Sequence, residues 1–431
     1  MLGSGTSTNE GVHDLTGPSL FTSSLSRYAA SLEATSHVEE MWQEIRAAHL
    51  AGKIKRRDHL ISRYLASHDV RLAATAAANR KLKPHRRPSK KQLAATASRL
   101  NARQGSEEEV RVSLRPKVNS QNDEFRTVAD FGIEHRTLQQ MVRDVLRAVG
   151  DLHPRQYAVR GGVHAAIGQV AQAMSAGYLW AVEIDIDNFF QSFVADKIID
   201  LMPLPKKVTE RIVISRCLSL IQGNLYPLFG PASDELVSET LAAARQGIPQ
   251  GSAASPIVAE RLLAWSLDQL PTGSEFVAYA DNILVLGKSE YEAASISSTL
   301  GSALMAHPAG PLRPNWPPKS FKAGQPILFL GHALTPTKTG VRIDPSPDNR
   351  AAFAYHLNRG LADIATHSTP LSARLRRAHD LRRMVRSWVG AFSLCPDVIA
   401  RRKTWLTEIN SAVAQAKAYM KSKSKTKHAN N

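Results

Sequence analysis

Residues 181–193 read Ala-Val-Glu-Ile-Asp-Ile-Asp-Asn-Phe-Phe-Gln-Ser-Phe. Apolar residues lead up to and alternate with the acids, a pattern that predicts a strand ending in carboxylates. Carboxylate oxygens suit Mg²⁺, which keeps several waters and is usually completed by substrate phosphates. The same pattern also fits a capped turn from a strand into a helix, so this stretch is informative only together with others.

A glycine-rich loop runs from residue 244 to residue 260, Ala-Arg-Gln-Gly-Ile-Pro-Gln-Gly-Ser-Ala-Ala-Ser-Pro-Ile-Val-Ala-Glu. Gly247 and Gly251 remove side-chain bulk, so the backbone can approach a ligand closely. Gln246 and Gln250 supply amide groups that can meet the edge of a base or a sugar. The alternative is an ordinary turn ahead of an apolar helix that starts near Ser255.

A third stretch, residues 276–287, reads Phe-Val-Ala-Tyr-Ala-Asp-Asn-Ile-Leu-Val-Leu-Gly. Two short apolar strands flank the polar residues, which predicts a tight hairpin, and an Asp-Asn pair is also ordinary turn chemistry. Asp185 and Asp281 lie far apart in the sequence. We nevertheless expect them to converge at neighbouring strand ends of one sheet.

The composition indicates a polyanionic partner. The chain carries 55 Lys and Arg against 38 Asp and Glu, for a net charge of +17, and such a surplus favours nucleic acid. No apolar run approaches the roughly 20 residues that span a bilayer, so we expect no membrane partner and a cytoplasmic location. Cys217 and Cys395 fit neither a zinc spacing nor a disulfide framework, and both are predicted to be buried thiols.

The order and spacing of these stretches resemble the reverse transcriptase family, in its bacterial branch of group II intron, retron and phage-defence enzymes. The resemblance covers roughly residues 115–334. It rests on four motifs in the family's order: Asp185-Ile-Asp-Asn-Phe-Phe190, Gln246-Gly-Ile-Pro-Gln-Gly-Ser-Ala-Ala-Ser-Pro256, Tyr279-Ala-Asp-Asn282, and Lys319 ahead of Phe329-Leu-Gly331.

The resemblance implies a polymerase site that uses two Mg²⁺ ions, with Mn²⁺ as a substitute. The implied catalytic residues are Asp185, Asp281 and Lys319, and the implied metal ligands are Asp185, Ile186, Asp281 and Asn282. Lys319 would serve the departing pyrophosphate as proton donor or charge partner, although Lys322 competes because prolines before both lysines hide the register. The implied substrate-binding residues are Lys117, Arg126, Phe190, Gln246, Gly247, Gln250, Gly251 and Tyr279.

Two positions bear on what the site would do. The aromatic ring of Phe190 would collide with a ribose 2′-hydroxyl, so the resemblance implies deoxynucleotides as substrates. Asn282 stands where most of the family has a second Asp. Either that acid is an outer ligand and the enzyme works without it, or the chain is an RNA-binding protein that has kept the shape of a polymerase.

The predicted fold class is α+β, a right-hand polymerase with fingers, a palm built on an antiparallel sheet and a helical thumb. Strand-like runs at 110–114, 125–131, 179–186, 275–279, 283–286 and 327–334 alternate with helical segments such as 136–149. The predicted order is a disordered lead-in (1–36), a basic helical N-terminal extension (37–109), fingers (110–180), palm with part of the fingers inserted (181–344), thumb (345–420) and a basic disordered tail (421–431).

The predicted function is RNA-directed DNA polymerase, a nucleotidyltransferase that takes dNTPs. Its expected partners are an RNA template, the nascent DNA and a dedicated non-coding RNA, with an oligomer or a partner protein left open. No nuclease segment follows the thumb, and analogy then favours a stand-alone enzyme of antiviral defence. The alternatives are an impaired RNA-binding scaffold or intron splicing helper, and a template-independent or protein-primed DNA synthesiser.

Overall fold

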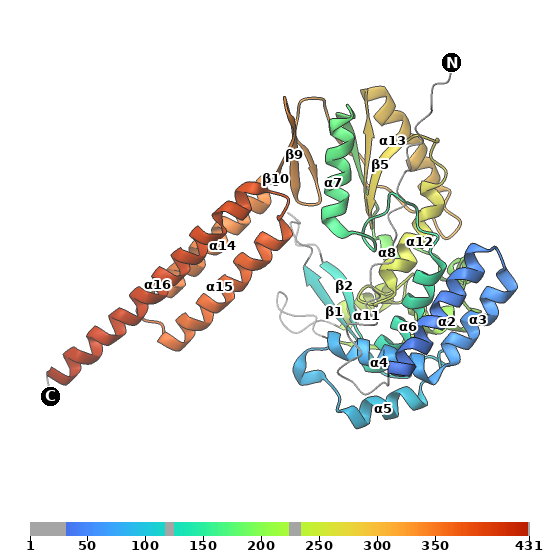
Figure 1. Cartoon of the computed structure of the whole chain (residues 1–431), viewed down its shortest axis with the longest axis horizontal. Helices are drawn as coiled ribbons and strands as arrows, with labels where there is room; N and C mark the ends of the chain where they lie inside the picture. The colour runs from blue at the N-terminus through green and yellow to red at the C-terminus, as the bar shows by residue number, and fades with distance from the viewer. Residues whose placement is uncertain (1–31, 117–124, 224–233, 430–431) are drawn as a thin grey trace, which may run out of the picture. The chain divides into compact units, whose positions relative to one another are not determined.

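The computed structural model describes residues 32–116, 125–223 and 234–429 (Figure 1). They form two compact units, each assembled from three segments of the chain. Unit 1 takes the chain up to His153, Asn188–Asp268 and Met305–Leu312; unit 2 takes Pro154–Asp187, Gln269–Leu304 and the chain from Arg313 onward. Both units mix helices with strands, so the predicted α+β class is confirmed.

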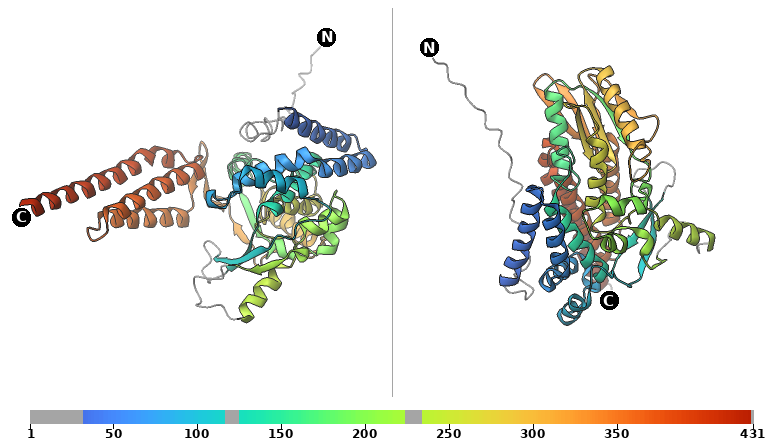
Figure 2. Two further views of the ribbon diagram at one scale, coloured as in Figure 1. Left: turned by 90° about the horizontal axis from the view of Figure 1, so that it is seen from below. Right: turned by 90° about the vertical axis from the view of Figure 1, so that its right-hand side faces the viewer.

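Unit 1 begins with a group of helices around α6 (Ile133–Val149), as the views in Figures 1 and 2 show. The indole nitrogen of Trp42 donates to the backbone oxygen of Asp144 in α6 at 2.8 Å. Arg261 and His49 both bind the carboxylate of Asp151, at 2.8 and 2.7 Å. The basic N-terminal helices are therefore an integral part of unit 1. Their bounds are α2 Leu32–Leu50, α3 Ile54–Ala66, α4 His68–Lys81, η1 Pro84–Arg86 and α5 Lys90–Arg99.

The sheet of unit 1 has the strand order β2-β1-β4. Strands β1 (Val110–Pro116) and β2 (Phe125–Asp130) are antiparallel, and β4 (Leu220–Gln222) runs parallel to β1. A buried cluster of Val, Ala, Phe and Leu side chains from these strands and their flanks forms its core. The remaining elements are α8 Phe189–Ser192, α9 Ala195–Leu201, α10 Lys206–Val208, the π-helical turn η2 Thr209–Val213, η3 Ser215–Cys217, α11 Asp234–Ala244 and α12 Ser255–Leu267.

The glycine-rich loop is held between two parts of unit 1. Gly247 has φ +55°, and a Cβ there would lie 2.1 Å from the backbone oxygen of Phe190, which accepts a hydrogen bond from the neighbouring Ile248 at 2.9 Å. Gly251 has φ +103°, and its Cβ would lie 2.2 Å from the backbone oxygen of Ala129. Both glycines thus permit a close approach to the protein's own backbone, whereas the sequence had suggested an approach to a ligand.

Unit 2 is built on a four-stranded sheet of order β5-β6-β3-β7 in which all neighbours are antiparallel. Helix α7 (Gly162–Ser175) packs on it through a shared core of aliphatic and aromatic side chains. The strands are β3 Trp180–Asp185, β5 Glu275–Tyr279, β6 Asn282–Gly287 and β7 Lys319–Phe321, and α13 (Glu290–Met305) follows β6.

A second sheet in unit 2 corrects one predicted strand. The run predicted as one strand over 327–334 is two, β8 (Ile327–Phe329) and β9 (His332–Thr337), and β9 also pairs with β10 (Gly340–Pro345). The chain reverses at Leu330 and Gly331, whose φ angles are +45° and +77°. A two-residue hairpin of this kind needs positive φ at both positions. Leucine is an unusual choice for the first, which is why the apolar run hid the turn.

The chain ends in three helices that lie side by side (Figure 1; Figure 2, left). They are α14 (Pro347–Ala365), α15 (Leu371–Ala391) and α16 (Pro396–Ala429). The rings of Phe353 and Trp388 stack at a centroid distance of 4.5 Å in the core of this bundle. The predicted disordered tail over 421–431 is wrong as far as Ala429. No Pro or Gly interrupts the chain after Pro396, and Ala and Lys are strong helix formers.

Other expectations about order and boundaries also need correction. Helix α2 already includes Leu32 and the residues up to 36 that were predicted to be disordered, and residues 1–31 of the predicted lead-in lie outside the described range. The whole of the segment 154–180, which was predicted as part of the fingers, belongs to unit 2 with the strands of the predicted palm. The inserted segment 188–268 belongs to unit 1.

Cys395 is buried as predicted, but Cys217 is exposed. Its neighbours Ser215 and Leu218 turn inward, and this leaves the Cys217 side chain facing outward at the end of a short 3-10 turn. Across the described parts of the chain, no helix is long and apolar enough to cross a membrane.

Replacement of Gly247 by Ala should destabilise unit 1 by about 2 kcal/mol or more, because the added Cβ meets a backbone oxygen and the left-handed conformation is strained. Gly168→Ala is the matched control. Gly168 lies within α7 with no atom close to its would-be Cβ, so Ala there should stabilise by about 0.5–1 kcal/mol. Denaturant unfolding of both variants measures the difference, and equal stabilities would contradict the described packing.

A buried carboxyl group in α6 makes the stability depend on pH. Burial raises the pKa of Asp144 to about 7, although nearby Arg143, Arg147 and Lys81 favour its charged form. The folded protein therefore binds this proton more tightly than the unfolded chain does. The resulting stabilisation is present in full below about pH 4 and is lost as the pH rises through about 7.

Asp144→Asn removes the charge but keeps an oxygen for the amide of Gln140, which donates to the carboxyl group at 2.8 Å. We expect the variant to exceed the wild type in stability by roughly 1–3 kcal/mol at pH 8. The advantage should shrink as the pH falls to 5.5. Unfolding curves across this range test it, and a difference that does not vary with pH would refute it.

Candidate active site

Two acidic residues meet at the ends of neighbouring strands in unit 2. Strand β3 pairs with β6 so that Asp185 lies directly opposite Asn282. The backbone oxygen of Asp281 accepts a hydrogen bond from Ile186 at 3.2 Å. The predicted convergence of Asp185 and Asp281 is therefore a consequence of strand register.

The turn that carries Asp281 is strained. Tyr279 pairs with Asn282, so Ala280 and Asp281 form a two-residue hairpin turn. Ala280 has φ +53°, a left-handed conformation that costs a residue with a Cβ roughly 1–2 kcal/mol. Strain of this kind is concentrated at functional sites, where the surrounding structure enforces it.

Asp185 is held from a second side by a loop. The side-chain nitrogen of Asn315 donates to Oδ2 of Asp185 at 3.1 Å. The backbone nitrogen of Asn315 donates to the backbone oxygen of Asp185 at 2.8 Å. Burial, together with the charges of Asp281 and Glu183, raises the pKa of Asp185 to about 6. Each acid of the site therefore disfavours the ionised form of the other.

A divalent cation fits this donor set. No group of three or more His, Cys, Asp or Glu side chains that would cage a metal occurs in residues 32–116, 125–223 and 234–429. Mg²⁺, however, is usually bound by one or two carboxylates, with waters and substrate phosphates completing its shell. Asp185 and Asp281 provide two such carboxylates, and their mutual repulsion favours a cation between them.

Asn282 has a defined role in the structure. Its side-chain nitrogen donates to Oδ1 of Asp281 at 3.2 Å. An Asp at this position would place a second negative charge against Asp281, whereas the amide orients the Asp281 carboxylate and still exposes a carbonyl oxygen. The amide thus supports one of the two acids.

Lys319 lies on the strand next to β3. Strand β7 pairs with β3 so that Lys319 is opposite Glu183, and its Nζ lies 3.5 Å from Oε2 of that residue. Because side chains alternate along a strand, Glu183 and Asp185 share a face of the sheet. Lys322 lies beyond the end of β7. The register therefore favours Lys319 over Lys322 as the lysine associated with the acids.

Sequence reasoning missed Glu183 and Asn315. Burial raises the pKa of Glu183, while Lys319 favours its charged form. Glu183 stands two residues before Asp185 in the same strand, and that spacing was a usable signal. Nothing in the sequence around Asn315 indicated that its amide would reach Asp185, since this contact depends on the path of the loop between prolines.

The predicted triphosphate ligands belong to unit 1. Arg126 is exposed in β2, and its partner across the strands is Arg115, also exposed. Like charges directly opposite one another repel, and an anion such as a polyphosphate would relieve that repulsion. Arg115 was not predicted as a ligand. Lys117 lies outside the described residues.

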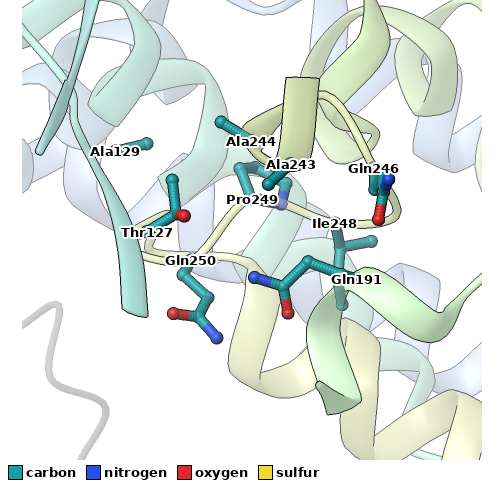
Figure 3. Close-up of a pocket in the computed structure, with 9 residues that line it drawn as sticks. All are labelled: Thr127, Ala129, Gln191, Ala243, Ala244, Gln246, Ile248, Pro249 and Gln250. Atoms are coloured by element: carbon teal, nitrogen blue, oxygen red, sulfur yellow. The ribbon is translucent and has the colours of Figure 1, made fainter. Parts of the chain in front are cut away.

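The glycine-rich loop places its two glutamines around a small hollow (Figure 3). Gln246 and Gln250 line it together with Gln191, which follows Phe190 in α8. The hollow has about 10 Å³ of space, enough for one water and far too little for a base.

The predicted site residues divide between the two units. Unit 1 contains Arg126, Phe190, Gln246, Gly247, Gln250 and Gly251. Unit 2 contains Asp185, Ile186, Tyr279, Asp281, Asn282 and Lys319.

Comparison with known proteins agrees with this geometry. The family described as reverse transcriptase (RNA-dependent DNA polymerase) matches residues 116–308, a little under half of the chain. That span contains Asp185, the glycine-rich loop and the Asp281 hairpin. No curated protein matches the sequence.

Solved structures that align with this chain include two telomerases. Telomerase from Candida albicans, in complex with the TWJ fragment of telomeric RNA, aligns with 73% of this chain and 61% of its own, at 12% identity and a TM-score of 0.33. Apo telomerase from Candida tropicalis, truncated from the C-terminal domain, aligns with 56% of each chain, at 11% identity and a TM-score of 0.34. The chain thus spans roughly three fifths of these relatives.

The matched span begins at the last residue of β1 and contains β2 to β6, the helices between them and α13. Residues 116–308 therefore match the reverse transcriptase family and lie within an α+β right-hand polymerase fold.

Proposed function

We propose that this protein is an RNA-directed DNA polymerase that uses two Mg²⁺ ions, with Mn²⁺ as a substitute, and takes dNTPs. One observation carries the proposal. Asp185 lies opposite Asn282 in the β3–β6 pair, and Asp281 stands next to it in a strained turn. Two carboxylates brought together at adjacent strand ends are suited to hold divalent cations.

Each residue of the site has a role in this proposal. Mg²⁺ held by Asp185, Asp281, the backbone oxygen of Ile186 and the amide oxygen of Asn282 would activate a primer 3′-hydroxyl and brace the triphosphate. The ammonium group of Lys319 is exposed and is positioned by Glu183. It is suited to donate a proton to the departing pyrophosphate or to stabilise its negative charge.

Residues of unit 1 would hold and select the nucleotide. The guanidinium groups of Arg126 and Arg115 are each able to grip two phosphate oxygens. Phe190 would exclude the 2′-hydroxyl of a ribonucleotide. The glycine-rich loop would present Gln246 and Gln250. In unit 2, Tyr279 would contribute from the base of the acidic hairpin. Gly247 and Gly251 would act by allowing this loop its path.

The nucleic acid would lie against basic helices. On α15 the side chains of Arg376, His379, Arg383 and Arg386 are exposed and recur every three or four residues, so they form one stripe on the helix. Such a stripe fits the regularly spaced phosphates of a template and its product strand. We further propose, by analogy with bacterial relatives, a dedicated non-coding RNA as template, a role in antiviral defence and a cytoplasmic location.

Primer extension on an RNA template tests the activity. Wild-type protein should incorporate dNTPs in preference to rNTPs in Mg²⁺ or Mn²⁺. Asp185→Asn and Asp281→Asn should each lower the rate at least about 100-fold, because a ligand matters at least as much as the outer-shell partners whose loss costs 10- to 100-fold. Both variants should still bind RNA.

Asp200→Asn is the matched control, because Asp200 is an exposed carboxylate paired with Lys206, and surface pairs of this kind contribute little. It should leave the rate within about twofold. The proposal fails if wild-type protein binds RNA tightly but incorporates no nucleotide on any primed template in either metal. That result would favour an RNA-binding scaffold.

A further inference from the structure

A short proline-rich segment of unit 2, Arg313-Pro-Asn-Trp-Pro-Pro-Lys319, runs beside the end of β3. The backbone nitrogen of Asp187 donates to the backbone oxygen of Arg313 at 2.9 Å. The backbone nitrogen of Asn315 donates to the backbone oxygen of Asp185 at 2.8 Å. Between these bonds, Ile186 forms a bridge with Pro314. We call this segment the strap. It lies alongside the residues at and just beyond the end of β3.

The strap is stiff. Three of its seven residues are prolines, and each proline ring fixes the backbone angle φ. The side chain of Asn315 adds a further anchor, because it donates to the Asp185 carboxylate. The residue between Asn315 and the next proline is therefore presented in a set place before any ligand arrives, and such preorganisation lowers the entropic cost of binding.

That residue is Trp316, which is 85% exposed. Among the described aromatic residues only Tyr291, at 84%, is similarly bare. Single apolar side chains on a surface are common and need no explanation. Trp316 differs in two ways. Its neighbour Asn315 contacts a carboxylate of the candidate active site, and it lies between the hydrogen-bonded Asn315 and Lys319, where β7 begins to pair with β3.

Exposed cations flank this residue in the sequence of the strap. Arg313 is exposed three residues before it, and Lys319 is 78% exposed three residues after it. An aromatic side chain among cations is typical of surfaces that bind nucleotides, since the ring stacks on a base while the cations hold phosphates. The guanidinium group of Arg313 is suited to two phosphate oxygens at once.

We propose that the strap is a nucleotide-binding element, in which Trp316 stacks on a base and Arg313 binds the phosphate attached to that base. The base with its phosphate is common to a free nucleoside triphosphate and to the end of a nucleic-acid strand. The proposal rests on the proposed function in so far as it takes Asp185 to mark the reaction site. It adds a specificity surface outside the motifs that define the domain.

Equilibrium binding by the full-length protein tests the strap. The probes are a fluorescently labelled single-stranded RNA oligonucleotide without a primer, and dATP as its competitor. Trp316→Ala should weaken binding of at least one probe by about 5- to 150-fold, the range measured for stacking of one base on an aromatic ring. Trp316→Phe should restore the affinity to within about threefold, because it keeps a stacking face.

Tyr291→Ala is the matched control, since it removes an equally exposed ring from α13, and it should leave both affinities unchanged. Arg313→Ala should weaken binding at low salt and lose its effect near 1 M salt, where charges are screened. The effect of Trp316→Ala should persist there. A change confined to the oligonucleotide identifies a strand as the ligand, and a change in dATP binding identifies the free nucleotide.

The proposal is overturned if Trp316→Ala binds both probes as the wild type does, or if Trp316→Phe is as weak as Trp316→Ala. Its failure can be told apart from that of the proposed function. Lost binding in Trp316→Ala, together with a wild type that never incorporates dNTPs, would sink the polymerase and spare the strap. Normal incorporation with unchanged binding would sink the strap alone.

Discussion

The antiparallel pairing of β3 with β6 is the constraint on which the candidate site depends. It places Asp185 opposite Asn282 and so sets two carboxylates from distant parts of the chain against each other. The two negative charges repel each other, and the raised pKa of Asp185 reflects burial together with this repulsion. The core beneath the sheet must hold the arrangement against that repulsion, and a bound cation would remove it.

The other features of the site attach to the same strand. On one edge of β3, strand β7 brings Lys319 opposite Glu183. At its end the strap makes backbone hydrogen bonds with Asp185 and Asp187 and orients the Asp185 carboxylate through Asn315. On the other edge, the strained Ala280 turn aims Asp281, and Asn282 donates a hydrogen bond to it. A shift of β3 by one residue would turn its acids to the other face of the sheet.

Sequence patterns predicted the parts of this site that depend on local structure. Alternation of apolar and acidic residues indicated β3, and two short apolar runs around Tyr279-Ala-Asp-Asn282 indicated the hairpin. The bounds of β5 and the start of α12 agree with expectation. These succeed because periodicity and turn chemistry act over a few residues.

What the sequence did not reveal depends on contacts between distant segments. The match of Glu183 with Lys319 requires the register of β7, and the reach of Asn315 requires the path of the strap. Gly247 and Gly251 are required because a Cβ there would collide with the backbone oxygens of Phe190 and Ala129. No local sequence pattern indicates these contacts. Leu330 concealed a hairpin because leucine rarely takes a positive φ. The length of α16 was missed since a basic run is equally compatible with a helix and with a solvated coil.

The central claim is that Asp185 and Asp281 hold the divalent cation on which the chemistry depends. A crystal structure of the protein with Mn²⁺ and a dNTP, in which anomalous scattering locates the metal, tests it most directly. The account predicts a peak within about 2.2 Å of oxygens from both carboxylates. A peak that touches neither carboxylate, or no peak while the nucleotide is bound, would contradict it.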